Sequence, residues 1–182
     1  MKLGLKRGTV ELQPHQKAWE ENANHTISML KCILGAAAVD IQHIGSTSIK
    51  GICAKPIIDL VIGVRSFEDI MILKDALEAE GVIYRGQDHP GQHLFVMGDF
   101  EADTRTHHIH VVIFESKEWI NYVNFRDYLN TYPEKADEYD LLKRTLLEQF
   151  TLDRGKYTSG KQVLIDRLLK EAKDWRNAIN NI

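Results

Sequence analysis

Apolar side chains recur every three or four positions from Trp19 to Leu34, which is the spacing of one face of a helix. Pro14 stands ahead of this stretch, and a proline is tolerated in the first turn of a helix. Gly35 follows the last apolar position. The sequence therefore predicts a first helix that ends near Gly35.

Strand-like patterns follow this helix. Apolar and polar residues alternate over residues 39–44, a period of two that favours a strand. A nearly continuous apolar run over residues 56–64 predicts a strand buried on both faces, and Asp59 is the one charged residue in it. Four shorter segments also have strand-like composition: residues 10–12, 82–84, 93–97 and 107–114.

A second helix is predicted between two of these strands. Ser66 followed by Asp69 resembles a capping box, and Gly81 stands where a helix would end, so we expect a helix over residues 67–80. Pro133 marks a break between later helices, because proline does not continue a helix.

The order of these elements predicts the fold class. From Ser116 onward the periodicity is helical, with a further break over residues 151–160. Strands and helices followed by helices alone are typical of an α/β (α+β) fold. Because no linker or change of composition divides the chain, we expect one domain over residues 1–182, with a mixed α/β core in 1–114 and a helical part in 115–182.

Composition narrows the choice of partners and compartment. Of the 182 residues, 43% are hydrophobic and 27% are charged, which is typical of a globular chain. Lys and Arg number 23 against 26 Asp and Glu, a net charge of −3 that gives no strong signal for nucleic-acid binding. Cys32 and Cys53 show no disulfide or zinc-ribbon spacing. With no signal-peptide or membrane-spanning pattern, we expect a cytoplasmic protein without a membrane partner.

The first candidate site is the loop after the strand at residues 39–44. Gly45, Ser46, Thr47 and Ser48 follow one another there. A glycine allows the backbone to approach a phosphate closely, while hydroxyl and amide groups donate hydrogen bonds to its oxygens. The alternative is a capped turn with no ligand.

The aspartate in the next strand also requires an explanation. An unpaired carboxylate in an apolar strand costs several kcal/mol, so Asp59 should be paired, hydrogen-bonded or metal-bound. A salt bridge to Lys55 is the structural interpretation. The functional one is a Mg²⁺ ligand, because phosphoryl-transfer sites place a strand carboxylate beside the substrate phosphates.

Two histidines are expected on one face of a later strand. His108 and His110 are two positions apart, so their side chains project to the same face, opposite His107 and Ile109. Paired histidines can bind a metal, or one can act as a general base. Each can also be a hydrogen-bonded structural residue.

These residues lie within a pattern that resembles a known family. The sequences His-Ile-Gly-Ser-Thr-Ser at residues 43–48 and Ala-Lys-Pro-Ile-Ile-Asp at 54–59 closely resemble the signature of the GrpB family. The resemblance covers nearly the whole chain and continues through His108-Ile109-His110-Val111, Phe125-Arg126-Asp127-Tyr128-Leu129, Tyr139 with Lys143, and Tyr157 with Lys161.

The family in turn resembles the DNA polymerase β-like nucleotidyltransferases. Their pattern is a Gly-Ser pair that opens a helix, followed by Asp-x-Asp or Asp-x-Glu on the next strand. Gly45, Ser46 and Asp59 match this pattern, and Val61 stands where the second carboxylate belongs. The resemblance thus implies a nucleotidyltransferase-like mixed sheet with a C-terminal helical subdomain.

The departure at the second carboxylate changes the metal that we expect. Two-metal nucleotidyl transfer uses several carboxylates, and this chain offers one at this place. If His108 and His110 occupy the strand of the third carboxylate, the predicted metal ligands are Asp59, His108 and His110. Such a set predicts a single divalent ion, Mg²⁺ or Mn²⁺, with Zn²⁺ as the alternative.

Basic residues of the helical part complete the predicted site. Under the family resemblance Arg126 faces the cleft and binds a phosphate, although it could instead pair with Asp127 or Glu118. Lys143 with Tyr139 and Lys161 with Tyr157 are spaced i, i+4, so each pair shares a helix face. They form either a solvated surface or a basic wall that neutralises a triphosphate.

Three functions remain open from the sequence. The resemblance implies a nucleotidyltransferase that moves a nucleoside monophosphate from an NTP to a small-molecule or protein acceptor, with Asp59 and His110 as catalytic residues. One alternative is a catalytically silent protein that binds a nucleotide or another phosphorylated ligand. The other is a metal-dependent hydrolase. The predicted phosphate-binding residues are Gly45, Ser46, Thr47, Ser48, Lys55, Arg126, Lys143, Tyr157 and Lys161.

Overall fold

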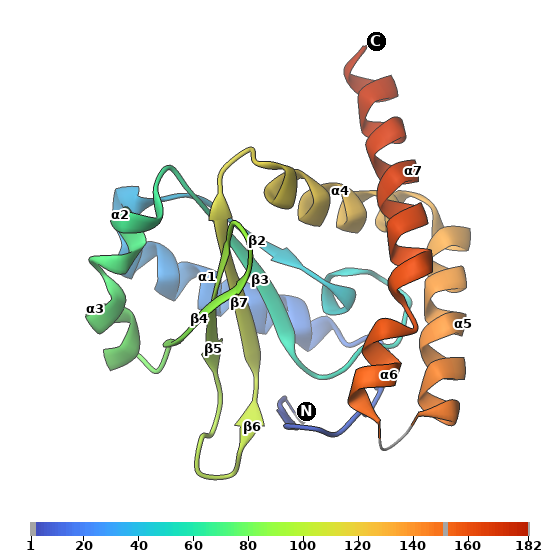
Figure 1. Ribbon diagram of the computed structural model, residues 1–182, viewed down its shortest axis with the longest axis horizontal. Coiled ribbons are helices and arrows are strands. Elements are labelled where there is room, and N and C mark those ends of the chain that lie inside the picture. Colours follow the sequence, from blue (N-terminus) through green and yellow to red (C-terminus); the bar gives the residue numbers. More distant parts are fainter. Residues whose placement is uncertain (1–2, 151–152, 182) are drawn as a thin grey trace.

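A five-stranded sheet forms the centre of the computed structural model, which describes residues 3–150 and 153–181 (Figure 1). Strands β3 and β7 are parallel, and all other neighbours in the sheet are antiparallel. A separate antiparallel pair joins β1 (Leu5–Lys6) to β6 (Thr104–Arg105). The strand order of the main sheet is β2 (Ala38–Ile44), β3 (Ile58–Val64), β7 (His107–Ile113), β5 (Gln92–Met97) and β4 (Ile83–His89).

The largest core lies on one face of this sheet, because alternate residues of each strand point the same way. Leu60 of β3 and Ile109 of β7 are fully buried there against Trp19 and Leu30. His107 also points to this face, where its ring hydrogen-bonds to Thr26 at 3.1 Å. The helices on this face are α1 (Lys17–Leu34), α2 (Phe67–Met71) and α3 (Lys74–Ala79).

Helix α4 (Lys117–Thr131) covers part of the opposite face, where Trp119 packs on Val61 of β3. Further helices gather beyond the edge strand β2, at the right of Figure 1: α5 (Pro133–Gln149), α6 (Arg154–Ser159) and α7 (Gln162–Asn180). Ile49 and Ile52, from the segment after β2, are buried among α4, α5 and α7. This packing attaches the helical part to the loop at the end of β2.

The predicted mixed α/β fold with C-terminal helices is confirmed. Two short 3₁₀ turns, η1 (Gly35–Ala37) and η2 (Ser46–Ser48), flank β2. None of the helices in the described part of the chain combines the length and apolar composition that crossing a bilayer requires.

Three local predictions were wrong. Residues 10–12 form no strand, and the neighbouring Gln13 makes only an isolated bridge to Ala54. The helix expected over residues 67–80 is divided, because the amide of Leu73 bonds three residues back, to Ile70, and tightens the turn there. Residues 151–160 are not simply a break, since α6 lies within them; residues 151 and 152 are outside the described part.

Candidate functional site

Gly45 allows the loop after β2 to lie directly against Asp59. The sheet register pairs Ile44 with Asp59, so the chain turns away from β2 just beside this carboxylate. Gly45 has φ +69° and ψ −173°, a conformation that is accessible essentially only to glycine. A Cβ atom at this position would lie 2.8 Å from the Cβ of Asp59. Both the backbone conformation and the close approach therefore require glycine.

The hydroxyl groups of the next turn have different roles. Thr47 is buried, and its hydroxyl hydrogen-bonds to Nε2 of His43 at 2.9 Å. Burial lowers the pKa of His43 to about 4, so this ring is neutral at pH 7. The Ser46 hydroxyl donates to the Tyr139 hydroxyl at 3.4 Å, whereas the Ser48 hydroxyl donates to the carbonyl of Gly45 at 2.7 Å. Ser48 thus caps its own turn.

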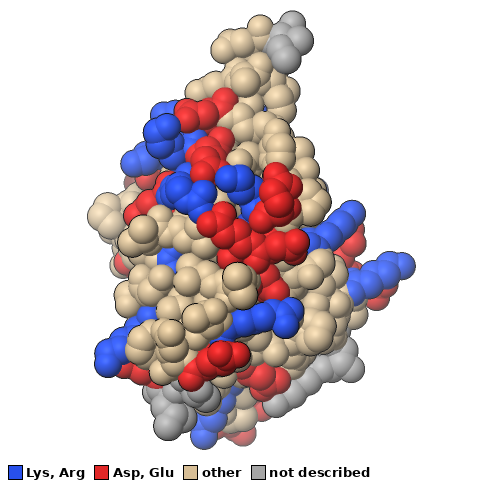
Figure 2. All heavy atoms as spheres, turned by 90° about the vertical axis from the view of Figure 1, so that its right-hand side faces the viewer, with Lys and Arg blue, Asp and Glu red and all other residues tan. Residues whose placement is uncertain are grey.

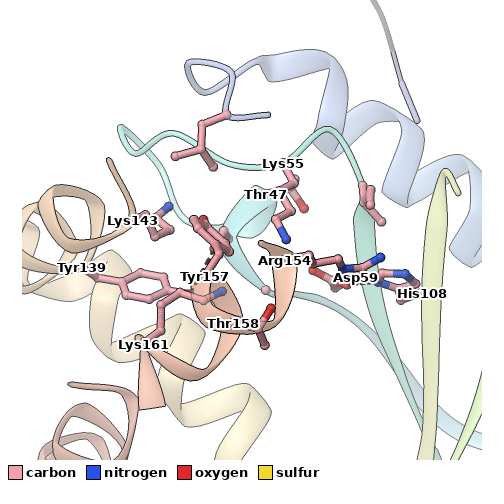
Figure 3. A pocket seen from close by; sticks show the side chains of 14 residues that line it. Thr47, Lys55, Asp59, His108, Tyr139, Lys143, Arg154, Tyr157, Thr158 and Lys161 are labelled. Atoms are coloured by element: carbon pink, nitrogen blue, oxygen red, sulfur yellow. Dashed lines mark hydrogen bonds and ion pairs between the residues drawn. The ribbon is translucent and has the colours of Figure 1, made fainter. Parts of the chain in front are cut away.

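A cavity of about 260 Å³ opens beside this turn (Figure 3). Its lining comes from the loop after β2, the starts of β3 and β7, and the helices α5 and α6. Gly45, Ser46 and Thr47 line it, as predicted, and Ser48 does not. Its charged lining residues are Lys55, Asp59, Lys143, Arg154 and Lys161, with His108 beside them.

Positive charge crowds this cavity. The Tyr157 ring has the ammonium group of Lys55 4.5 Å from its centroid and that of Lys161 4.7 Å from it. Burial, together with the charges of Lys161 and Arg154, lowers the pKa of Lys55 to about 8. Burial also lowers the pKa of Lys161. Within the described residues, no carboxylate forms an ion pair with Lys55, Arg154 or Lys161.

Lys143 differs from the other three cations because its charge is already compensated. Its ammonium group donates to the carbonyl of Cys53 and lies 3.4 Å from a carboxylate oxygen of Asp140. Burial lowers its pKa to about 8. Lys143 and Tyr139 share a helix face, as the i, i+4 spacing predicted, with the ammonium 4.8 Å from the ring centroid.

Asp59 is paired with a histidine rather than with Lys55. Asp59 and His108 are register partners on the parallel strands β3 and β7, and Nδ1 of His108 lies 3.2 Å from Oδ1 of Asp59. Burial by itself raises the pKa of the Asp59 carboxyl, but the hydrogen bond with His108 and the electrostatic interactions with His108, His110 and His43 together outweigh burial, so the pKa lies below its usual value. The pair borders the cavity beside Gly45.

His110 lies outside the lining of this cavity. Its register partner is Val61, and its ring stacks on Tyr122 with the centroids 5.2 Å apart. Burial lowers the pKa of His110, and its Nδ1 atom is buried without a hydrogen-bond partner among the described residues. Of the two histidines predicted on this strand face, His108 lines the cavity and His110 does not.

The predicted metal centre is not assembled. Among the residues that the structure describes, no three His, Cys, Asp or Glu side chains come together in a way that could hold a metal ion. Asp59 and His108 meet, but His110 is turned onto Tyr122. Val61, at the place of the second carboxylate, is fully buried. Asp59, His108 and His110 therefore do not form one coordination site for a metal ion.

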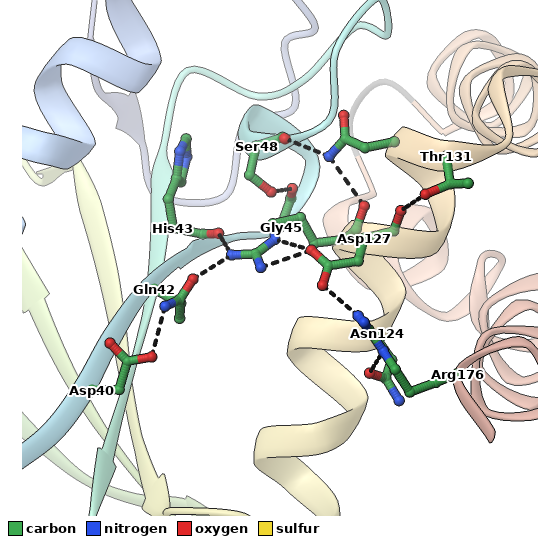
Figure 4. A network of polar contacts seen from close by, with 11 residues as sticks. Asp40, Gln42, His43, Gly45, Ser48, Asn124, Asp127, Thr131 and Arg176 are labelled. Atoms are coloured by element: carbon green, nitrogen blue, oxygen red, sulfur yellow. Dashed lines mark hydrogen bonds and ion pairs between the residues drawn. The ribbon is translucent and has the colours of Figure 1, made fainter. Parts of the chain in front are cut away.

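Arg126 does not line this cavity and instead joins elements together through Gln42, His43 and Asp127, which Figure 4 labels. Its guanidinium donates to the Gln42 side chain at 2.8 Å and to the carbonyl of His43 at 3.0 Å. It also pairs with Asp127 at 2.7 Å, and Arg176 of α7 binds the same carboxylate. The guanidinium of Arg126 thus binds β2 and its own helix, which includes the expected alternative pair with Asp127.

Two polar cavity residues, Arg154 and Thr158, were missed by the sequence reasoning, as were the apolar Leu12 and Ile57. Arg154 and Thr158 lie on α6, inside the segment expected to be a break. Arg154 and Thr158 are spaced i, i+4 and share a face of α6, and Lys161 follows in the turn between α6 and α7. The i, i+4 spacing of Arg154 and Thr158 was the sequence signal that could have identified these residues.

Comparison with known structures places this fold among the nucleotidyltransferase-like folds. The Cid1 poly(U) polymerase with MgGTP bound superimposes with a TM-score of 0.52 at 12% identity, covering 74% of this chain and 44% of that one. At this identity the likeness shows the fold alone. The conserved protein GrpB from Enterococcus faecalis superimposes with a TM-score of 0.83 at 32% identity, covering 91% of this chain and 99% of that one.

The sequence comparisons identify the family. A model of the family described as GrpB protein matches residues 9–171, so the chain belongs to the GrpB family. The glutamate-rich protein GrpB of Alkalihalophilus pseudofirmus is 37% identical over 172 residues, which is 93% of this chain and 99% of that protein. The UPF0157 protein YqkA of Bacillus subtilis is 34% identical over 94% of this chain, which spans only 50% of that relative.

Proposed function

We propose that this protein binds the phosphate groups of a nucleotide, or of another phosphorylated small molecule, in the cavity beside Gly45. The observation that carries the proposal is the group of three cations, Lys55, Arg154 and Lys161, that border the cavity without a carboxylate partner among the described residues.

Charge arithmetic favours an anionic ligand. Four cationic side chains line the cavity against one carboxylate, Asp59, which is held by His108. Because Asp140 compensates Lys143, about two positive charges remain unbalanced. Burial and the charges of Lys161 and Arg154 lower the pKa of Lys55 to about 8, and an anion that enters the cavity offsets the repulsion among these cations. Hydroxyl groups of Ser46, Thr47 and Thr158 add hydrogen-bond donors.

A small ligand fits this protein better than a nucleic acid does. The face drawn in Figure 2 mixes acidic and basic side chains and shows no continuous basic surface. On the helices α5 and α7, Arg167 pairs with Glu138 and Glu171, and Lys135 pairs with Glu171. The unbalanced cations lie instead around the cavity beside Gly45.

Nucleotidyl transfer is the second candidate, and the Asp59–His108 pair favours it. A histidine held by an ionised carboxylate can accept the proton of an attacking hydroxyl group. The acceptor oxygen would bond to the α-phosphorus of the nucleotide while pyrophosphate leaves. The structure gives no support to metal-dependent hydrolysis, because Asp59, His108 and His110 do not come together as metal ligands among the described residues.

Binding can be tested by titration calorimetry with inorganic triphosphate and ATP, in EDTA and in Mg²⁺. We expect binding in EDTA, and Arg154→Ala or Lys161→Ala should each lower the affinity about tenfold, because each removes a charge-assisted contact. The matched control is Lys170→Ala, since Lys170 is an exposed α7 lysine paired with Asp174. No binding of either ligand at low salt would contradict the proposal.

Transfer needs its own assay, which is pyrophosphate release from ATP with pools of small-molecule and protein acceptors. We expect His108→Ala to bind triphosphate within about threefold of the unmodified protein, because Lys55, Arg154 and Lys161 remain in the cavity wall, and to release no pyrophosphate. If the unmodified protein releases none either, the binding function stands and the transfer function does not.

A further inference from the structure

A second cavity, of about 480 Å³, meets the first at the Gly45 loop. Gly45 lines both cavities. Helices α4 and α7 form most of the second cavity, and the turn between β4 and β5 closes one side of it. The two cavities therefore adjoin at Gly45.

The second cavity has the opposite electrostatic character to the first. Among the described residues, no Lys or Arg lines it, and Glu118 is its one carboxylate. Ile165 and Leu169 of α7 give it an apolar wall, while Gln92, Asn121 and Gln162 supply amide groups. This surface disfavours a phosphate and suits an uncharged group that carries hydrogen-bonding edges.

Aromatic rings stand between the two cavities in fixed positions. Tyr122 and Phe125 of α4 both line the second cavity. The Tyr122 hydroxyl donates to the Gln92 side chain at 2.7 Å, and its ring stacks on His110. Phe125 contacts Tyr139, a residue of the first cavity, edge to face with the centroids 5.6 Å apart. The aromatic wall is thus held in place without a ligand.

We infer that the second cavity binds an uncharged planar ring of the same ligand whose phosphate groups occupy the first. The inference rests on the proposed function and specifies its ligand as a ring-bearing phosphate compound, of which nucleoside triphosphates are the available probes. The phosphate groups of such a ligand would bind in the basic first cavity, and its uncharged ring would bind in the adjoining second cavity.

The test compares inorganic triphosphate with ATP, GTP, CTP and UTP by calorimetry in EDTA. At least one nucleoside triphosphate should bind tenfold or more tightly than triphosphate, because stacking a base on an aromatic ring contributes about 5- to 150-fold. Phe125→Leu removes the ring face but keeps an apolar side chain. Leu169→Trp fills the cavity with a bulky side chain.

Both variants should lower the affinity for that nucleotide about tenfold and leave the affinity for triphosphate within twofold. The matched control is Val163→Trp, because Val163 is 84% exposed on α7 and outside both cavities, so it should change neither affinity.

The outcomes separate the two proposals. If triphosphate binds and no nucleotide binds more tightly, or if the variants weaken both ligands equally, the ring site is wrong and the phosphate site stands. If neither triphosphate nor any nucleotide binds, the proposed function fails and the ring site fails with it.

Discussion

Replacing Gly45 by alanine should damage the fold and the site together. The conformation of this residue, φ +69° and ψ −173°, costs a non-glycine residue about 2 kcal/mol. The new Cβ would also lie 2.8 Å from the Cβ of Asp59, and relieving such an overlap costs about 2 kcal/mol more. The sum of about 4 kcal/mol corresponds to a fall in Tm of roughly 8–16 °C for a chain of this length.

Gly51 provides the matched control. It also has positive φ, +82°, but a Cβ there meets nothing within 4 Å. Gly51→Ala should therefore lower the free energy of unfolding by about 2 kcal/mol, from backbone strain alone. Urea denaturation with an unchanged m-value measures both variants, and triphosphate affinity should fall only in Gly45→Ala. If Gly45→Ala is no less stable than Gly51→Ala, the contact with Asp59 does not constrain the loop.

Three further predictions concern the charges of the site. The pKa of Asp59 lies below its usual value, so its ionised form stabilises the fold above about pH 4, and this stabilisation is lost as the pH falls further. Asp59→Asn should therefore reduce the acid-induced fall in Tm. An unchanged Tm–pH profile would contradict this prediction. Because Lys55 has a pKa of about 8 and a bound anion favours its charged form, triphosphate affinity should decline as the pH rises through 8. Calorimetry should show a weaker decline for Lys55→Arg, since arginine keeps its charge at this pH. Identical pH profiles for the two proteins would exclude Lys55 as a contact. Val61→Asp should lower the free energy of unfolding by several kcal/mol without adding Mg²⁺ binding, because Val61 is fully buried. Val163→Asp, on the exposed surface of α7, should leave the stability unchanged. A folded Val61→Asp protein that binds Mg²⁺ more tightly would refute the placement of Val61 in the core.

Local sequence patterns predicted the parts of the site that neighbouring residues build. Gly45 and Asp59 come together because antiparallel strands place Ile44 opposite Asp59, and both segments had clear strand patterns. The i, i+4 pairing of Tyr139 with Lys143 needed only a regular helix.

The same patterns did not indicate which hydrogen-bond partners a side chain would find. Arg126 looked like a phosphate ligand, but the structure brings Gln42 and Asp127 to its guanidinium. His110 had the same strand face as His108, yet Asp59 is opposite His108 and the apolar Val61 is opposite His110. Register between distant strands decided which histidine is paired.

The sequence by itself determined the alternation of strands and helices, and it placed Gly45 where the backbone adopts a conformation that only glycine tolerates. It also determined that an aspartate interrupts a buried strand, because these features depend on residues a few positions apart. Only the tertiary structure brought Lys55 to the same cavity as Arg154 and Lys161, since Lys55 lies far from the other two in the sequence and the helical part is held by the packing of Ile49 and Ile52 among α4, α5 and α7. The opposite electrostatic characters of the two cavities are likewise set by long-range packing, which no local pattern encodes.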